Sequence, residues 1–192
     1  MDKRAAIAEA FRQGDYALTP RGVLINRSVL ATGRYHHSVN GQDLQVDDNL
    51  ITAEGIAYIL GVAMGSTEAR ISDWYLAVFS GNVTPAANWT AANFAAQASE
   101  IVSTTEGYSN ATRPIWTPGA VAMGVMGNLT ARAVFNIACT TSVNISGAAV
   151  LSSNTRGGTA GKLISATRFG TVRQVYAGDA FELGYEIELQ DS

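Results

Sequence analysis

The sequence feature that most restricts the fold is a strict alternation of apolar and polar side chains near the end of the chain. From residue 180 to 189, small or acidic residues alternate with Phe181, Leu183, Tyr185, Ile187 and Leu189. Because successive side chains of a strand point to opposite faces, this pattern predicts an antiparallel strand that is half buried, with an acidic outer face. The pair Gly178-Asp179 predicts a turn into this strand from another strand at 172–176.

Strand-like runs recur through the chain beyond residue 65, separated by Gly, Asn or Pro. Residues 73–80 (DWYLAVFS) are apolar on both faces, which is typical of a strand in the middle of a sheet or at an interface. Five further strand-like runs lie at 99–106, 111–117, 131–138, 143–152 and 161–169. Short strands with regular turn signals predict a mainly β fold, an antiparallel β-sandwich of the jelly-roll-like type.

Two segments carry helix signals instead. Thr52 is a good N-cap, and an apolar stripe at helical spacing follows it, formed by Ile56, Ile59, Leu60 and Ala63. The Ala-rich segment 84–99, with Thr90 as a second cap, predicts one or two short helical turns between strands. We therefore expect a sandwich with one or two short helices.

The first 48 residues follow a different pattern. Residues 3–13 place Ile7 and Phe11 on one apolar stripe, which predicts a short amphipathic helix that needs a partner surface. Asn40-Gly41 is the strongest turn pair of the chain and predicts a hairpin. We interpret 1–48 as an N-terminal arm that docks on a neighbour, and 49–192 as the β-sandwich domain.

Composition narrows the classes of function. Only 15% of the 192 residues are charged, against about 25% in typical domains, so we expect much of the surface to face other protein. The net charge is −3 and Lys3-Arg4 is the longest basic stretch, so we expect no nucleic-acid partner. No apolar run approaches the roughly 20 residues that cross a bilayer, so we expect no membrane partner. The single Cys139 excludes an internal disulfide.

Candidate catalytic and metal-binding residues are few. His36-His37 lies near Asp43, Asp47 and Asp48, but adjacent side chains of an extended chain point to opposite sides, so we predict no metal site. The sequence has no Gly-x-Ser-x-Gly motif, and Glu182, Glu186 and Glu188 share one strand face as solvating charges. We predict no enzymatic activity and no cofactor.

Two other patterns leave alternatives open. The glycine-rich segment 154–161 lacks the Lys-Ser/Thr and the following helix of a phosphate-binding loop, so we interpret it as a flexible hairpin or inter-strand loop. Trp74, Trp89 and Trp116 are candidates for a sugar-stacking platform, although Trp74 lies in a doubly apolar strand, where a core or interface position is the simpler interpretation.

Five segments carry a resemblance to a known family: NLITAEGIAYIL (49–60), DWYLAVFSGNVTPAANWTAANFA (73–95), TRPIWTPG (112–119), LSSNTRGGTAGKLISATRF (151–169) and AGDAFELGYEIEL (177–189). Together they resemble small virion structural proteins of tailed bacteriophages. The resemblance covers roughly 49–189 and contains no catalytic motif. It implies a β-rich module that attaches to the virion as a head decoration (cement) or fibre-type component, often as a symmetric oligomer.

We therefore predict a non-enzymatic capsid decoration protein that binds the major capsid protein or another virion protein, made in the bacterial host cytoplasm and located in the virion. We expect a homo-oligomer, and a trimer because capsid lattices offer three-fold sites. The alternatives are a tail, collar or fibre-base structural protein, or a glycan-binding attachment module. The candidate partner-binding residues are Ile7, Phe11, Tyr35, His36, His37 and an exposed Trp89.

Overall fold

The computed structural model describes residues 16–19, 22–25, 29–65 and 68–191. The chain divides into two compact units, Met1–Ala31 with Leu189–Ser192, and Thr32–Glu188. In the first unit, strands β1 (Tyr16–Thr19) and β2 (Gly22–Ile25) pair as an antiparallel hairpin. The helix predicted at 3–13, with Ile7 and Phe11, lies outside the described residues. We call Thr32–Glu188 the sandwich unit.

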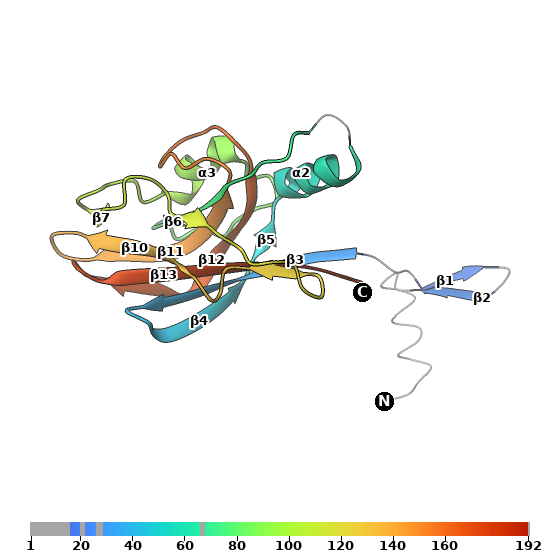
Figure 1. The fold of residues 1–192 in the computed structure, drawn as a ribbon, viewed down its shortest axis with the longest axis horizontal. Helices are drawn as coiled ribbons and strands as arrows, with labels where there is room; N and C mark the ends of the chain where they lie inside the picture. Colours follow the sequence, from blue (N-terminus) through green and yellow to red (C-terminus); the bar gives the residue numbers. More distant parts are fainter. Residues whose placement is uncertain (1–15, 20–21, 26–28, 66–67, 192) are drawn as a thin grey trace. The chain divides into compact units, whose positions relative to one another are not determined.

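Two antiparallel sheets form the β-sandwich (Figure 1). One has the strand order β4-β3-β13-β10-β7, with β9 also paired to β13, and the other has the order β5-β12-β11-β6-β8. The elements are β3 (Val29–Val39), β4 (Gln42–Asp48), β5 (Leu50–Ile51), α2 (Ala53–Met64), β6 (Trp74–Phe79), α3 (Ala91–Ala98), β7 (Gly107–Tyr108), β8 (Ile115–Trp116), β9 (Val125–Gly127), β10 (Ala133–Ala138), β11 (Val143–Leu151), β12 (Leu163–Val175) and β13 (Ala180–Asp191). The predicted mainly β sandwich is confirmed.

The core has two layers, which explains why the strand at 73–80 is apolar on both faces. Leu76 and Val78 of β6 belong to the cluster between the two sheets. Ala77 and Phe79 face the other way, into a second cluster with Phe94 of α3. The five-stranded sheet is therefore covered by the second sheet on one face and by α3 on the other, so β6 has no solvated face.

The last strand follows its predicted alternation as far as Ile187, whereas Leu189 is 46% exposed. Phe181, Leu183 and Tyr185 of β13 are buried in the core between the sheets. Glu182 and Glu186 point to the other face and are half-buried. Nη2 of Arg132 lies 3.0 Å from Oε2 of Glu182, and Nε of Arg34 lies 3.4 Å from Oε1 of Glu186, so both carboxylates form ion pairs. The acidic face of the strand is thus partly covered by basic side chains from other elements.

Helix α2 begins where the sequence predicts, because the Thr52 hydroxyl accepts a hydrogen bond from the Gly55 amide at 3.0 Å. Of the predicted apolar stripe, only Ile59 packs against the core. Ile56 and Leu60 are 46% and 57% exposed, whereas Gly55 and Tyr58 face inward. A Cβ on Gly55 would lie within contact distance of the Ile164 backbone, so the helix docks on β12 through its smallest residue.

Two other expectations need correction. We expected an arm up to residue 48, but β3 and β4 are two strands of the six-stranded sheet, and the sandwich unit begins at Thr32. The hairpin predicted at Asn40-Gly41 is confirmed, and it joins these two strands. The strand expected at 99–106 is reduced to a single antiparallel bridge between Glu100 and Phe79, and a turn follows at 104–106.

Candidate functional site

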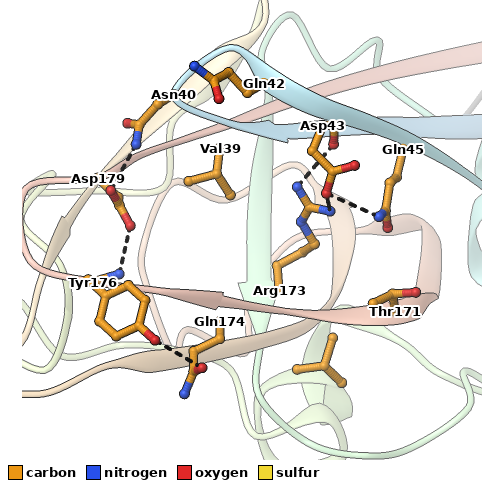
Figure 2. A pocket seen from close by; sticks show the side chains of 11 residues that line it. Val39, Asn40, Gln42, Asp43, Gln45, Thr171, Arg173, Gln174, Tyr176 and Asp179 are labelled. Atoms are coloured by element: carbon orange, nitrogen blue, oxygen red, sulfur yellow. Dashed lines mark hydrogen bonds and ion pairs between the residues drawn. The ribbon is translucent and has the colours of Figure 1, made fainter.

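A polar groove of about 530 Å³ lies between the β3–β4 hairpin and the C-terminal half of β12 (Figure 2). Alternate residues of β4, Asp43, Gln45 and Asp47, face β12 from the free edge of their sheet. The residues that line the groove are Val39, Asn40, Gln42, Asp43, Gln45, Thr171, Val172, Arg173, Gln174, Tyr176 and Asp179.

An ion pair between Asp43 and Arg173 occupies one wall of the groove. Nη1 of Arg173 donates to Oδ2 of Asp43 at 2.6 Å, and Nη2 donates to the Asp43 carbonyl oxygen at 3.0 Å. Asp43 has φ 52°, the left-handed region that non-glycine residues rarely adopt. Arg173 therefore holds both the side chain and the backbone carbonyl of a residue in this conformation.

The opposite wall is a hydrogen-bonded turn that leads from β12 into β13. The Asp179 carboxylate accepts from the Tyr176 amide at 2.8 Å and from the Asn40 side chain at 2.8 Å. The hydrogen bond from the Tyr176 amide, with that from Asn40, lowers the pKa of Asp179 below its ordinary value. This carboxylate therefore stays ionised and ties the β3–β4 hairpin to the β12–β13 turn.

Beside the groove, His37 and Asp47 form a buried polar contact. Nε2 of His37 lies 2.8 Å from Oδ2 of Asp47, and the other carboxylate oxygen of Asp47 accepts from the Gly170 amide at 2.8 Å. The imidazole stacks on Phe169 with 3.9 Å between ring centroids. Burial lowers the pKa of His37, although the hydrogen bond to Asp47 opposes this shift, which favours the neutral ring. In the neutral ring, an N–H at Nε2 is the tautomer that can donate to the Asp47 carboxylate.

Of the predicted partner-binding residues, Tyr35, His36, His37 and Trp89 lie in the described part of the chain, and the structure does not bring these four together on one exposed surface. Tyr35 and His37 are fully buried, and Trp89 is only 5% exposed because it packs edge-on against Phe79 and Phe94. The expectation of an exposed Trp89 is therefore wrong. His36 is half-buried, with Nε2 at 3.2 Å from Glu186.

The two adjacent histidines do point to opposite sides of β3, toward Glu186 and toward Asp47, as predicted. Among residues 29–65 and 68–191, no group of three or more His, Cys, Asp or Glu side chains is placed to hold a metal ion. The three tryptophans form no platform, since Trp89 and Trp116 are buried in different clusters.

The glycine-rich segment 154–161 connects β11 to β12, as an inter-strand loop, and an ion pair with no exposed side-chain surface holds it. Nε and Nη2 of Arg113 each donate to Glu100 at 2.7 Å. Glu100 also accepts from the Gly157 amide at 3.0 Å, and Arg113 donates to the Ser153 carbonyl at 2.8 Å. The guanidinium of Arg156 lies 4.3 Å from the centre of the Tyr108 ring. These contacts anchor the loop at 154–161, so they do not fit the prediction of a flexible loop.

A second exposed feature is the outer face of α2, formed by Ile56, Leu60 and Met64, of which Met64 is 86% exposed. The inner face of the helix, through Tyr58 and Ile59, closes a small apolar cavity of about 120 Å³ between the sheets. We call the three outer residues the α2 apolar face.

Sequence reasoning missed Arg173 and Tyr176 as members of the groove. Arg173 is 130 residues from Asp43 in the chain, so no local spacing joins them. The one sequence signal for a residue of the groove was the turn pair Gly178-Asp179. It predicted the turn between β12 and β13, but not the hydrogen bond from Asn40 to Asp179.

No helix within the described ranges is long and apolar enough to cross a membrane. No protein-family model and no curated protein matches this sequence.

Proposed function

We propose that this chain is a non-enzymatic virion structural protein, a capsid decoration protein that binds the major capsid protein. The observation that carries the proposal is the α2 apolar face, where Ile56, Leu60 and Met64 stand exposed on one helix. Exposed apolar residues that gather in one place mark protein interaction sites, whereas single ones are ordinary. Low charge content supports the same conclusion, because charged residues are depleted at interface cores.

A decoration protein stabilises a shell by mass action, since it binds the assembled lattice and not the free subunits. Such a role requires a rigid body that presents the same contact surface many times. The two-layered core and the anchored loop at 154–161 supply that rigidity. We propose that the chain forms a homo-oligomer, and we expect a trimer. Sedimentation velocity of the purified chain measures the number of subunits.

The test of the capsid role is co-sedimentation of the purified chain with capsids that lack it. Leu60→Glu should weaken binding by about tenfold or more, because burial of one leucine contributes roughly 1.5–3 kcal/mol. Leu44→Glu on β4 is the matched control, since Leu44 and Leu60 are 53% and 57% exposed. Equal binding of both variants and the unmodified protein would contradict the proposed contact.

The N-terminal segment is proposed as a second contact, through the predicted helix that carries Ile7 and Phe11. Because β3 begins at Val29, a truncation that removes residues 1–28 leaves every strand of the two sandwich sheets in place. This truncated chain should lose most of its affinity for capsids. Full binding by the truncated chain would refute the role of the segment and leave the α2 apolar face as the proposed contact.

A further inference from the structure

We propose that the groove between β4 and β12 binds a neutral carbohydrate, a ligand beyond the capsid contact proposed above. Its volume of about 530 Å³ lies within the range of about 300–1,000 Å³ that small-molecule sites occupy. The groove is lined from three places in the chain: the β3–β4 hairpin, the end of β12, and the turn into β13 (Figure 2). It therefore presents a shaped surface and not one exposed loop.

The polar side chains of the groove suit hydroxyl groups. Gln42 and Gln45 each offer an amide oxygen that accepts and an amide nitrogen that donates, and Thr171 offers a hydroxyl that does both. Within the described part of the chain, the Gln42 and Thr171 side chains have no hydrogen-bond partner, and Gln45 has only a long contact to Asp43 at 3.4 Å. A sugar hydroxyl, which donates and accepts at once, satisfies such groups.

Apolar surface lies among these polar groups. Figure 2 shows Val39 between Asp179 and Asp43, and Tyr176 next to Asp179 and Gln174, and both side chains line the groove. Tyr176 is 54% exposed, and its hydroxyl donates to Gln174 at 3.1 Å, which fixes the direction of the ring. An aromatic face next to planar polar groups matches the two-sided character of a pyranose, whose ring C–H groups pack on the aromatic while its hydroxyls form hydrogen bonds.

The charges of the groove favour a neutral ligand. Arg173 is the one cationic residue among those that line it, and Asp43 already engages both of its terminal nitrogens. The Asp179 carboxylate accepts two hydrogen bonds from the protein. A phosphate or sulfate would find no free cation and would face two carboxylates, whereas a neutral polyol would meet walls already held in place, which lowers the entropic cost of binding.

The experiment screens the full chain on an array of neutral glycans and measures the affinity of each hit by isothermal titration calorimetry. We expect at least one neutral glycan to bind, with Tyr176→Ala and Gln42→Ala each weakening it by about tenfold, roughly the loss of one aromatic or hydrogen-bonded contact. Tyr176→Phe should retain most of the affinity, because it keeps the ring. Gln97→Ala, at an exposed glutamine of α3, is the matched control and should bind normally.

Two results would overturn the inference: no neutral glycan binds, or glycan binding is unchanged in the groove variants. In the first case, the groove variants can in addition lose capsid binding. That loss would make the groove a protein contact. Leu60→Glu separates this test from the proposed function, because that change lies on α2 and should leave glycan binding intact even where capsid binding is lost. Thermal unfolding of each variant confirms that it is folded.

Discussion

At the scale of single residues, the unusual side chains are ionisable groups that are buried away from solvent. Glu100 and Arg113 carry opposite charges with no exposed side-chain surface, and His37 is buried with one ring nitrogen, Nδ1, that has no hydrogen-bond partner among the described residues. Such groups contribute little net stability when they are paired, but removal of one partner leaves the other uncompensated. Substitutions here should therefore have effects larger than their contacts suggest.

The buried ion pair gives the first prediction. Arg113→Met should lower the free energy of unfolding by about 3–5 kcal/mol, because Glu100 is left buried and charged. Lys162→Met removes a cation from an exposed pair with Glu68, at 3.6 Å and 34% and 41% side-chain exposure, and should cost about 1 kcal/mol or less. Urea denaturation measures both values. Equal losses in the two variants would contradict this account of burial.

The titration of His37 gives the second prediction. Burial holds the pKa of His37 in the folded protein below its ordinary value of 6.5, so the unfolded chain binds the proton first as the pH falls. The stability that comes from the neutral ring is therefore complete above about pH 6.5 and is lost as the pH falls toward the folded-state pKa. The charged groups around the ring are Asp47, Asp43 and Arg173, of which the two carboxylates oppose the shift.

His37→Gln keeps an amide donor near Asp47 but removes the titration. Between about pH 7 and pH 5, the free energy of unfolding of this variant should fall less steeply with pH than that of the unmodified protein. The two slopes should differ by at most about 1.4 kcal/mol per pH unit, the value for one proton. Denaturation curves at several pH values provide the comparison. Parallel pH profiles would show that His37 does not titrate differently on folding.

At the scale of elements, close approach of backbones decides how α2 docks, and this is the part of the fold that hydrophobic periodicity misjudged. Of the apolar stripe in the sequence, Ile59 packs against the core, whereas Ile56 and Leu60 are exposed. The contact with β12 is made instead by Gly55, which has no side chain for a hydropathy pattern to count. By contrast, the N-cap at Thr52 was predictable, since a cap is a local hydrogen bond between residues three apart.

Two glycines of α2 give the third prediction, as a matched pair in one helix. Gly55→Ala should destabilise the protein by about 1–3 kcal/mol, because the added Cβ meets the Ile164 backbone and the helix must shift. Gly61→Ala meets Cβ and Cγ of the exposed Glu68 side chain, which must shift, but the change also gains helix propensity, so it should alter the free energy of unfolding by less than about 1 kcal/mol. Thermal unfolding measures the sign of each change, and two losses of equal size would refute the docking argument.

At the scale of the whole molecule, the sandwich was predictable where strands alternate plainly, and the extent of the unit was not. β13 follows its alternation, whereas the inward residues of β3 are Gly33, Tyr35 and His37, a glycine, an aromatic and a polar ring that no hydropathy pattern identifies as a buried face. The groove was hidden for a different reason, because the pairing of Asp43 with Arg173 exists only after two sheets meet.

The position of β3 leads to the last prediction, on where the chain tolerates truncation. Tyr35 of β3 is fully buried, its ring lies 4.7 Å from that of Tyr185, and its hydroxyl is 2.7 Å from the Ser165 hydroxyl of the opposite sheet.

Removal of residues 1–28 keeps the contact between Tyr35 and Ser165 and should leave the cooperative unfolding transition of the sandwich in place. Removal of residues 1–48 takes away β3 and β4, exposes β13 as a new sheet edge, and should give a chain with no cooperative transition. Circular dichroism melts of the two truncated chains separate the cases, and cooperative unfolding of the shorter chain would mean that the sandwich begins after residue 48.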